Sequence, residues 1–401
     1  MRLFLSALTL ILAVAAPVAA QQRPVILIGI DGFRADYLER GVTPTISRLA
    51  AEGVKAEGGM KASFPTVTFP NFFTLATGRH PDRHGLIYNA MTDARAPGRQ
   101  FTLRNRAEVM DGFWYEAEPI WVTAERAGMT TATMFWPGSE AAIGGVRPRH
   151  WIPFEQTVPS AARVNIVLGW MTLPEAERPD LVTLYFDVVD TAGHRFGPGA
   201  PETDAALGQV DAALALLLEG LAARGIEADL VIVADHGMAG ISGERIAWLD
   251  ERVDLSALTV RALGPVALLD PVPGREAEAA AVVGEGPNLS CWARADVPAR
   301  LAYGRNDRVP AYVCLARTGW VAGIRGQTDP ARISGGAHGY DPEAFEMRAL
   351  FIAHGPAFRR GLSLTGMDSV DVQPLLGRLL GLTVPAGDGR AEDTLPAMRV
   401  P

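Results

Sequence analysis

Side chains able to bind metal ions follow three apolar, β-branched runs of this sequence. The runs are residues 25–30, 181–186 and 230–234. The side chains that follow them are Asp31, Asp190 with His194, and Asp235 with His236. An unpaired charge at the margin of an apolar core is costly to desolvate, so these carboxylates need a partner. Carboxylates and imidazoles at the carboxyl ends of parallel strands suit a metal site in an open α/β sheet.

His338 is a further candidate ligand. It lies in the glycine-rich stretch 335–339, and glycine lets the backbone fold tightly around an ion. With the residues above, it gives three carboxylates and three imidazoles, enough for two zinc-like sites that share a hydroxyl nucleophile. Taken singly, each of these histidines would be interpreted as structural, and the other four histidines of the chain are assigned no role.

Thr68 is the candidate nucleophile. It lies at the start of an expected helix, where free N–H groups and the helix dipole favour a developing alkoxide and an anionic phosphoryl group. The alternative is that the Thr68 hydroxyl only caps the helix, which is a common use of threonine.

Alternating strand and helix patterns must position these residues. We expect strands at 25–30, 130–135, 181–189, 230–234 and 348–353, and helices at 45–52, 120–127, 202–224 and 370–380. Such alternation predicts an α/β fold with a mostly parallel sheet flanked by helices on both faces. Apolar residues make up 48% of the chain, which is ample for a large core.

Residues 240–335 have a different composition, rich in Pro, Gly and Arg with short alternating runs. We interpret them as a smaller subdomain inserted into the main domain, which would span residues 21–401. The two cysteines of the chain, Cys291 and Cys314, fall inside it. They could form a disulfide in an oxidising compartment or remain two separate buried thiols.

The first twenty residues have the pattern of a secretory signal peptide. Arg2 precedes an apolar stretch, and small residues lie before Gln21. No later segment is judged long and apolar enough to cross a membrane, so we expect an exported protein, periplasmic or secreted, without stable membrane insertion. The chain has 37 Lys+Arg against 45 Asp+Glu, which argues against wrapping of nucleic acid. A small phosphorylated substrate stays compatible, because bound cations can supply local positive charge.

Several short blocks of the chain combine candidate site residues with glycine, proline or aromatic residues. They are Asp31-Gly32-Phe33-Arg34, Thr68-Phe69-Pro70-Asn71, residues 77–86 with Asn89, Phe135-Trp136-Pro137-Gly138, Asp190-Thr191-Ala192-Gly193-His194, Asp235-His236-Gly237-Met238 and Gly336-Ala337-His338-Gly339-Tyr340. Together these blocks resemble the nucleotide pyrophosphatase/phosphodiesterase family of the alkaline phosphatase superfamily, and they occur in family order over residues 26–382. The resemblance implies an alkaline-phosphatase-like fold.

The resemblance also implies a role for each site residue. One metal ion would be held by Asp190, His194 and His338, and a second by Asp31, Asp235, His236 and Thr68. Asn89 would hold a phosphoryl oxygen. From the mechanism, the backbone amide of Phe69 is a further candidate donor to the developing oxyanion. Phe69 and Tyr185 match aromatic positions that flank the base or leaving group. One departure is Phe72, where many members carry histidine.

These roles predict a two-zinc hydrolase of phosphodiester or pyrophosphate bonds in nucleotides, acting through a phospho-threonine intermediate. Hydrolysis of phosphonates, phosphomonoesters or lysophospholipids on the same site is the alternative activity. A non-enzymatic alternative is an exported module that only binds a ligand. Trp121 and Trp136 could line a substrate slot, although tryptophan more commonly packs in the core. The oligomeric state is left open by the sequence.

Overall fold

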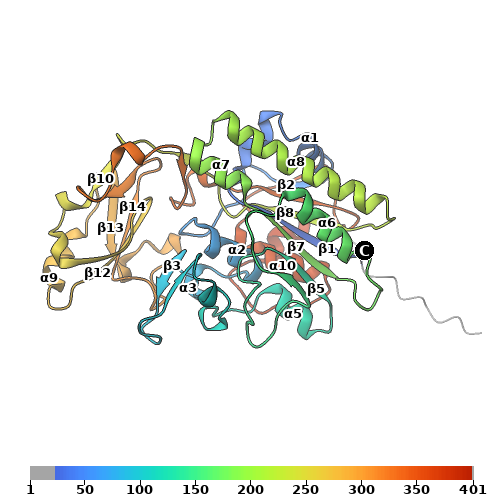
Figure 1. Ribbon diagram of the computed structural model, residues 1–401, viewed down its shortest axis with the longest axis horizontal. Helices are drawn as coiled ribbons and strands as arrows, with labels where there is room; N and C mark the ends of the chain where they lie inside the picture. The colour runs from blue at the N-terminus through green and yellow to red at the C-terminus, as the bar shows by residue number, and fades with distance from the viewer. Residues whose placement is uncertain (1–22, 400–401) are drawn as a thin grey trace, which may run out of the picture.

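The computed structural model describes residues 23–399, so the expected signal peptide lies outside the described residues. An eight-stranded sheet forms the centre of the main body (Figure 1). In spatial order its strands are β18 (Leu362–Leu364), β2 (Val54–Ala56), β17 (Phe351–His354), β8 (Asp229–Val233), β1 (Val25–Ile30), β7 (Leu181–Phe186), β5 (Thr131–Met134) and β6 (His150–Ile152). The strands from β8 to β6 are mutually parallel, whereas β17 runs antiparallel to β8 and β2.

Helices cover both faces of this sheet, and the expected α/β class with a mostly parallel sheet is confirmed (Figure 1). One face carries α1 (Pro44–Glu52), α6 (Ser160–Trp170), α7 (Val188–Phe196) and α8 (Pro201–Ala222). The other carries α2 (Thr68–Thr77), α5 (Ile120–Arg126) and α10 (Val372–Leu379). Because both faces are covered, all six residues of β1 are buried, as its continuous apolar run predicts.

The structure corrects two expected strand boundaries. The strand expected over 181–189 ends at Phe186, and α7 begins at Val188. The strand expected over 348–353 begins only at Phe351, because Ala349 pairs instead with Arg34 and Met60 through isolated bridges. Apolar residues lie on both sides of each boundary, Val188 and Val189 after Asp187 and Ala349 and Leu350 before Phe351, so hydrophobicity alone could not place them.

Helix α8 also corrects an expectation, because by length and composition it could cross a membrane. It packs against α1, α6 and α7, and the core side of the helix buries Leu207, Val210 and Leu214. It is therefore a core helix of the main body, and its apolar character is explained by packing.

A second lobe contains a four-stranded antiparallel sheet with its own buried cluster (Figure 1). Its strands lie in the order β11 (Leu258–Ala262), β12 (Val266–Pro271), β14 (Tyr312–Ala316) and β13 (Leu289–Ala293). The lobe also contains β10 (Ile246–Trp248), α9 (Glu276–Ala279) and β15 (Val321–Gly323). Short strands β9 (Ala239–Gly240) and β16 (Gly336–Ala337) pair where the chain leaves and re-enters the main body. Cys291 and Cys314 face each other on β13 and β14 and form a disulfide.

The remaining short elements lie around the main body. They are α3 (Pro81–His84), the hairpin of β3 (Ala90–Thr92) and β4 (Gln100–Thr102), α4 (Arg106–Val109) and α11 (Ala391–Thr394). The β3–β4 hairpin lies beside the second lobe, where it contacts β11.

Candidate metal centre and nucleophile

Three neighbouring parallel strands bring the candidate carboxylates to one edge of the sheet. Strands β8, β1 and β7 are adjacent, and their carboxyl ends lead to Asp235, Asp31 and Asp190 respectively. The close approach depends on Gly32, which has a φ of 68°. A Cβ atom at Gly32 would lie 3.0 Å from the Cα and Cβ atoms of Asp190, so a larger residue would push the two segments apart.

Asp190, His194 and His338 form one tight group of ligand-type atoms. Asp190 Oδ1 lies 3.4 Å from His194 Nε2 and 3.5 Å from His338 Nε2, and the two nitrogens are 3.0 Å apart. Asp190 and His194 project from the same side of α7, one helical turn apart. His194 lies in the last turn of this nine-residue helix.

Asp31, Asp235 and His236 form a second group beside the first. His236 Nε2 lies 2.9 Å from Asp235 Oδ2 and 3.7 Å from Asp31 Oδ1. The other carboxylate oxygens are used to orient these side chains. Asp31 Oδ2 accepts a hydrogen bond from the Tyr185 hydroxyl at 2.6 Å, and Asp235 Oδ1 accepts one from the Gly32 N–H at 3.2 Å.

All three imidazoles present Nε2 to the cluster. The Nδ1 atoms of His194, His236 and His338 lie 2.9, 2.9 and 2.8 Å from the backbone carbonyls of Gly336, Gly237 and Thr66. Each Nδ1–H therefore donates to a carbonyl, which fixes the tautomer and leaves a lone pair on Nε2. The rings of His236 and His338 are stacked with centroids 3.6 Å apart.

Several buried oxygen atoms in the cluster have no hydrogen-bond partner among the described residues. They are Asp31 Oδ1, Asp190 Oδ1 and Asp235 Oδ2. Burial, followed by the charges of Asp235 and Asp190, raises the pKa of Asp31 well above its usual value. Burial likewise raises the pKa of Asp190, although His194 and His236 oppose the shift. For Asp31 and Asp190, the effect of burial thus exceeds the compensation that the neighbouring groups provide.

The donor set fits divalent cations. Two ligands bound to zinc at 2.0–2.1 Å in tetrahedral geometry lie about 3.3 Å apart. The distances within the group of Asp190, His194 and His338 are close to that separation. The burial that lowers the pKa of His338 well below its usual value also keeps its imidazole neutral, as a ligand must be.

Thr68 is the first residue of α2. The N-cap position of this helix is occupied by Val67, whose side chain makes no capping hydrogen bond. The capping alternative for Thr68 is therefore wrong. The Thr68 hydroxyl oxygen instead lies 3.4 Å from His236 Nε2, at the margin of the cluster. At this position the hydroxyl also lies at the positive end of the helix dipole.

Asn89 lies next to the first turn of the same helix. Its Oδ1 accepts the N–H of Phe69 at 3.0 Å, which leaves the Nδ2 group to donate elsewhere. We expected the Phe69 N–H to face a phosphoryl oxygen, but this group is already bonded to Asn89. Its effect is to orient the Asn89 amide.

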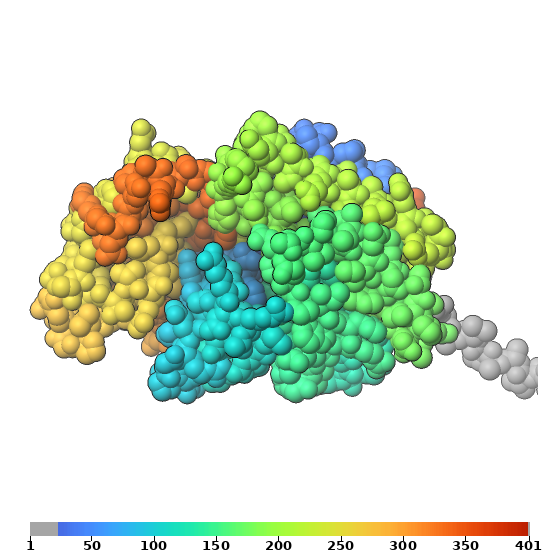
Figure 2. Space-filling view, in the orientation of Figure 1, coloured from blue at the N-terminus to red at the C-terminus, as the bar shows by residue number. Residues whose placement is uncertain are grey.

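A pocket of about 130 Å³ opens beside Thr68. Phe69 and Tyr185 both line it, so the two aromatic residues assigned from the sequence lie in one pocket. The Tyr185 ring is largely buried, and burial with the Asp31 charge raises its pKa well above the usual value. Figure 2 shows the surface hollowed between the cyan segment, the green helices and the yellow-orange second lobe, with blue atoms at the bottom.

Sequence reasoning missed other residues of this pocket. They are Leu103, Val109, Phe135, Gly138, Glu140 and Phe154, together with Pro137. Phe135 belongs to a block that carried the family resemblance, whereas Phe154 has no sequence signal. Trp136 is buried but lines the pocket, and Trp121 lies wholly in the core. Phe72, the departure from the family pattern, packs edge-on against Trp136 and Tyr185 and forms part of the core.

This chain is similar in sequence to proteins of one known family. The model of the type I phosphodiesterase / nucleotide pyrophosphatase family matches residues 25–341. Venom phosphodiesterase CdcPDE of Crotalus durissus collilineatus is 36% identical over 391 residues, covering 94% of this chain and 46% of the venom protein. Human ectonucleotide pyrophosphatase/phosphodiesterase family member 5 is 34% identical over 371 residues, covering 92% of this chain and 76% of the relative. The chain thus spans about half the length of the venom relatives.

Solved structures show the same similarity. The murine ectonucleotide pyrophosphatase/phosphodiesterase 5 has 32% sequence identity and a TM-score of 0.88, over 94% of this chain and 100% of that one. An inactive threonine-to-alanine variant of the murine protein, in complex with AMP, gives the same values. The match of the family model over most of the chain, and the human relative of which the chain covers 76%, lead to one conclusion. This chain belongs to the type I phosphodiesterase / nucleotide pyrophosphatase family.

Proposed function

We propose that this protein hydrolyses phosphodiester or pyrophosphate bonds in nucleotides and related small substrates, with Thr68 as the nucleophile. The observation that carries the proposal is the position of the Thr68 hydroxyl. It borders both the cluster of carboxylates and imidazoles, 3.4 Å from His236 Nε2, and the aromatic pocket. The murine relative supports the proposal, because its threonine-to-alanine variant is described as inactive and is in complex with AMP.

Two divalent cations, which we take to be Zn²⁺, would be held by Asp190, His194 and His338 and by Asp31, Asp235, His236 and Thr68. When bound, they supply a lowered pKa for the Thr68 hydroxyl and positive charge beside the phosphoryl oxygens and the leaving oxygen. Without the cations, an anionic substrate would be repelled by three clustered carboxylates. The positive charge of the cations therefore decides whether the phosphoryl group can approach.

The chain itself binds and orients the reacting groups. Thr68 Oγ1 forms a bond to phosphorus as the bond to the leaving oxygen breaks, which gives a phospho-threonine. Asn89 Nδ2 donates to a phosphoryl oxygen, because its Oδ1 is held by the Phe69 N–H. Water then cleaves the bond between phosphorus and Thr68 and restores the hydroxyl. Tyr185 keeps Asp31 in place through its hydroxyl throughout.

The aromatic pocket supports a substrate with a planar base. Stacking of a base on an aromatic side chain contributes about 1–3 kcal/mol. We therefore expect a nitrophenyl ester of a nucleoside 5′-monophosphate to have a kcat/KM about tenfold or more above that of bis(p-nitrophenyl) phosphate. The measurement is initial rates on zinc-loaded mature protein. The panel includes p-nitrophenyl phosphate, a phosphonate ester and a lysophospholipid, and preference for any of these would favour the alternative hydrolases.

Replacing Phe69 by alanine tests the pocket separately from the chemistry. Phe69 is half-buried and packs edge-on against Phe101 with ring centroids 5.5 Å apart. We expect Phe69→Ala to raise KM for the nucleotide ester about tenfold while changing kcat/KM for bis(p-nitrophenyl) phosphate less than about threefold. Phe345→Ala, at an exposed aromatic residue outside the pocket, is the control. Equal losses on both substrates would mean that Phe69 does not contact the base.

We also propose export, to the periplasm or as a secreted protein. The names of the relatives describe venom proteins and an ectonucleotide pyrophosphatase. The disulfide between Cys291 and Cys314 is in keeping with an oxidising compartment. The residues 240–335 form, in this proposal, an inserted subdomain that shapes the approach to the site. Turnover of the nucleotide ester would exclude the module that only binds a ligand.

A further inference from the structure

A strap of the second lobe, residues 303–308, lies against residues 82–93, the segment that contains Asn89 and β3. The Asp82 carboxylate accepts hydrogen bonds from the backbone N–H groups of Gly304, Arg305 and Asn306 at 3.0, 2.7 and 3.3 Å. The Tyr303 hydroxyl donates to the carbonyl of Ile87 at 3.0 Å. The strap is thus hydrogen-bonded to this segment both at Asp82 and at Ile87.

Arg308 makes the most extensive contacts of the strap. Its side chain is 1% exposed, and Nε donates to Asp93 Oδ2 at 2.7 Å. Its Nη1 donates to the carbonyls of Gly85 and Trp114 at 2.8 and 2.6 Å, and Nη2 donates to the carbonyl of Phe113 at 3.2 Å. Nη2 also lies 3.3 Å from Glu116 Oε1. One rigid guanidinium therefore holds several separate points of the main body.

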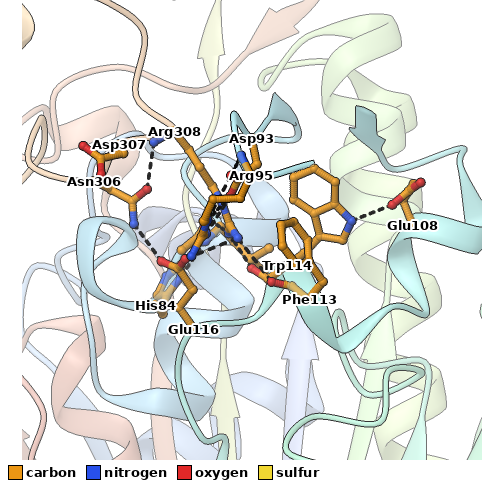
Figure 3. A network of polar contacts seen from close by, with 12 residues as sticks. His84, Asp93, Arg95, Glu108, Phe113, Trp114, Glu116, Asn306, Asp307 and Arg308 are labelled. Atoms are coloured by element: carbon orange, nitrogen blue, oxygen red, sulfur yellow. Dashed lines mark hydrogen bonds and ion pairs between the residues drawn. The ribbon is translucent and has the colours of Figure 1, made fainter. Parts of the chain in front are cut away.

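The charges around Arg308 are balanced locally. Arg95 pairs with both Asp93 and Glu116, at 2.6 and 2.5 Å, so two guanidinium groups face two carboxylates. Asn306 Nδ2 donates to Glu116 Oε2 at 2.9 Å (Figure 3). Because burying ion pairs costs desolvation energy, such a network is a poor source of net stability. The Arg308 guanidinium bonds one carboxylate and three backbone carbonyls at once, and this geometry is better suited to fixing the position of a segment.

Asn89 lies midway between two of the points that Arg308 holds. Gly85 is four residues before Asn89 and Asp93 is four residues after it. The Phe69 N–H fixes Asn89 Oδ1, but the direction of the Nδ2 group also depends on where the backbone of this loop lies.

We propose that Arg308 is a positioning residue that acts through Asn89: it fixes the loop 85–93 so that the Asn89 amide faces the phosphoryl group. The inference rests on the function proposed above, because it assigns Asn89 to transition-state stabilisation. The inserted lobe then contributes to the reaction without touching the substrate.

The test uses Arg308→Lys, which keeps the positive charge but removes the planar guanidinium group and its several N–H donors. We expect kcat for the nucleotide ester to fall about tenfold with KM changed less than about twofold, because a small displacement of a transition-state donor affects the chemical step. Arg325→Lys is the matched control. Arg325 pairs with Asp250 and Glu251 in the second lobe, and we expect it to behave as the wild type.

A double-mutant cycle separates positioning from a general structural effect. In the Asn89→Ala background, Arg308→Lys is expected to change kcat less than about twofold, because the group through which it acts is gone. An equal tenfold loss in both backgrounds would overturn the proposal, and so would an unchanged kcat in Arg308→Lys alone. If Arg308→Lys does not fold, Asn306→Ala takes its place with the same two outcomes.

Hydrogen exchange keeps this inference distinct from the proposed function. We expect amides of residues 85–93 to exchange about tenfold faster in Arg308→Lys, with β1 and β8 unchanged. Unchanged exchange over 85–93 would overturn the anchoring, whatever the activity. A wild-type protein that turned over no substrate of the panel would remove the proposed function and the role of Asn89, and faster exchange would then support only the anchoring of the loop.

Discussion

Thr68→Ala is expected to lower kcat/KM for the nucleotide ester by about 10⁴-fold or more, because removal of a nucleophile leaves only binding and electrostatic stabilisation. The fold should be unaffected. The Thr68 hydroxyl caps no helix and lies at the margin of the cluster, so its loss leaves no buried polar group without a partner. Initial rates and a melting curve on the same preparation check both statements.

Two variants control this experiment. Thr68→Ser keeps the hydroxyl and should retain activity within about a hundredfold of the wild type. Thr365→Ala removes the hydroxyl of an exposed threonine that is not a site residue, and it should change neither the initial rates nor the melting curve. Rapid quenching with a phosphorus-labelled substrate should trap label on the wild type and on Thr68→Ser only. An alanine variant with wild-type turnover would remove Thr68 from the mechanism.

Removal of divalent cations is expected to abolish turnover, to below about 1% of the loaded protein, and to restore it when Zn²⁺ is returned. The melting temperature should fall at the same time. Cations bind the folded site and compensate the unpaired oxygens of Asp31, Asp190 and Asp235, so they favour the folded state by about 4 kcal/mol per site at a thousandfold excess over Kd. Dialysis against a chelator, metal analysis and calorimetry measure these effects.

His236→Ala and His354→Ala provide the matched pair. His236 belongs to the group with Asp31 and Asp235, and its ligand atom also lies within 4.8 Å of ligand atoms of Asp190 and His338, so its loss should lower the metal content at both sites. His354 ends β17, away from the cluster, and its replacement should leave metal content and activity intact. Full turnover by protein shown to contain no divalent cation would contradict the two-metal proposal.

Local sequence pattern was sufficient for the architecture around the site. Continuous apolar runs predict buried strands because both faces of a parallel sheet are covered, and β1, β7 and β8 lie close to the expected ranges. The pattern failed where apolar residues resume just past a strand end, as Val188 and Val189 do after Asp187. At β7 it could not show that the backbone turns into α7, which carries Asp190 and His194 on one side.

The residue types and their order along the chain thus determined which side chains are candidates for the metal centre and which hydroxyl is the candidate nucleophile. Only the tertiary structure decided that three backbone carbonyls fix the imidazoles and that Phe154 lines the pocket. The tertiary structure also placed Arg308 against residues 85–93, which include Asn89. The physical reason is that hydrophobic periodicity reports the burial of neighbouring residues, whereas contacts between distant segments depend on strand order and on the path of the connecting loops.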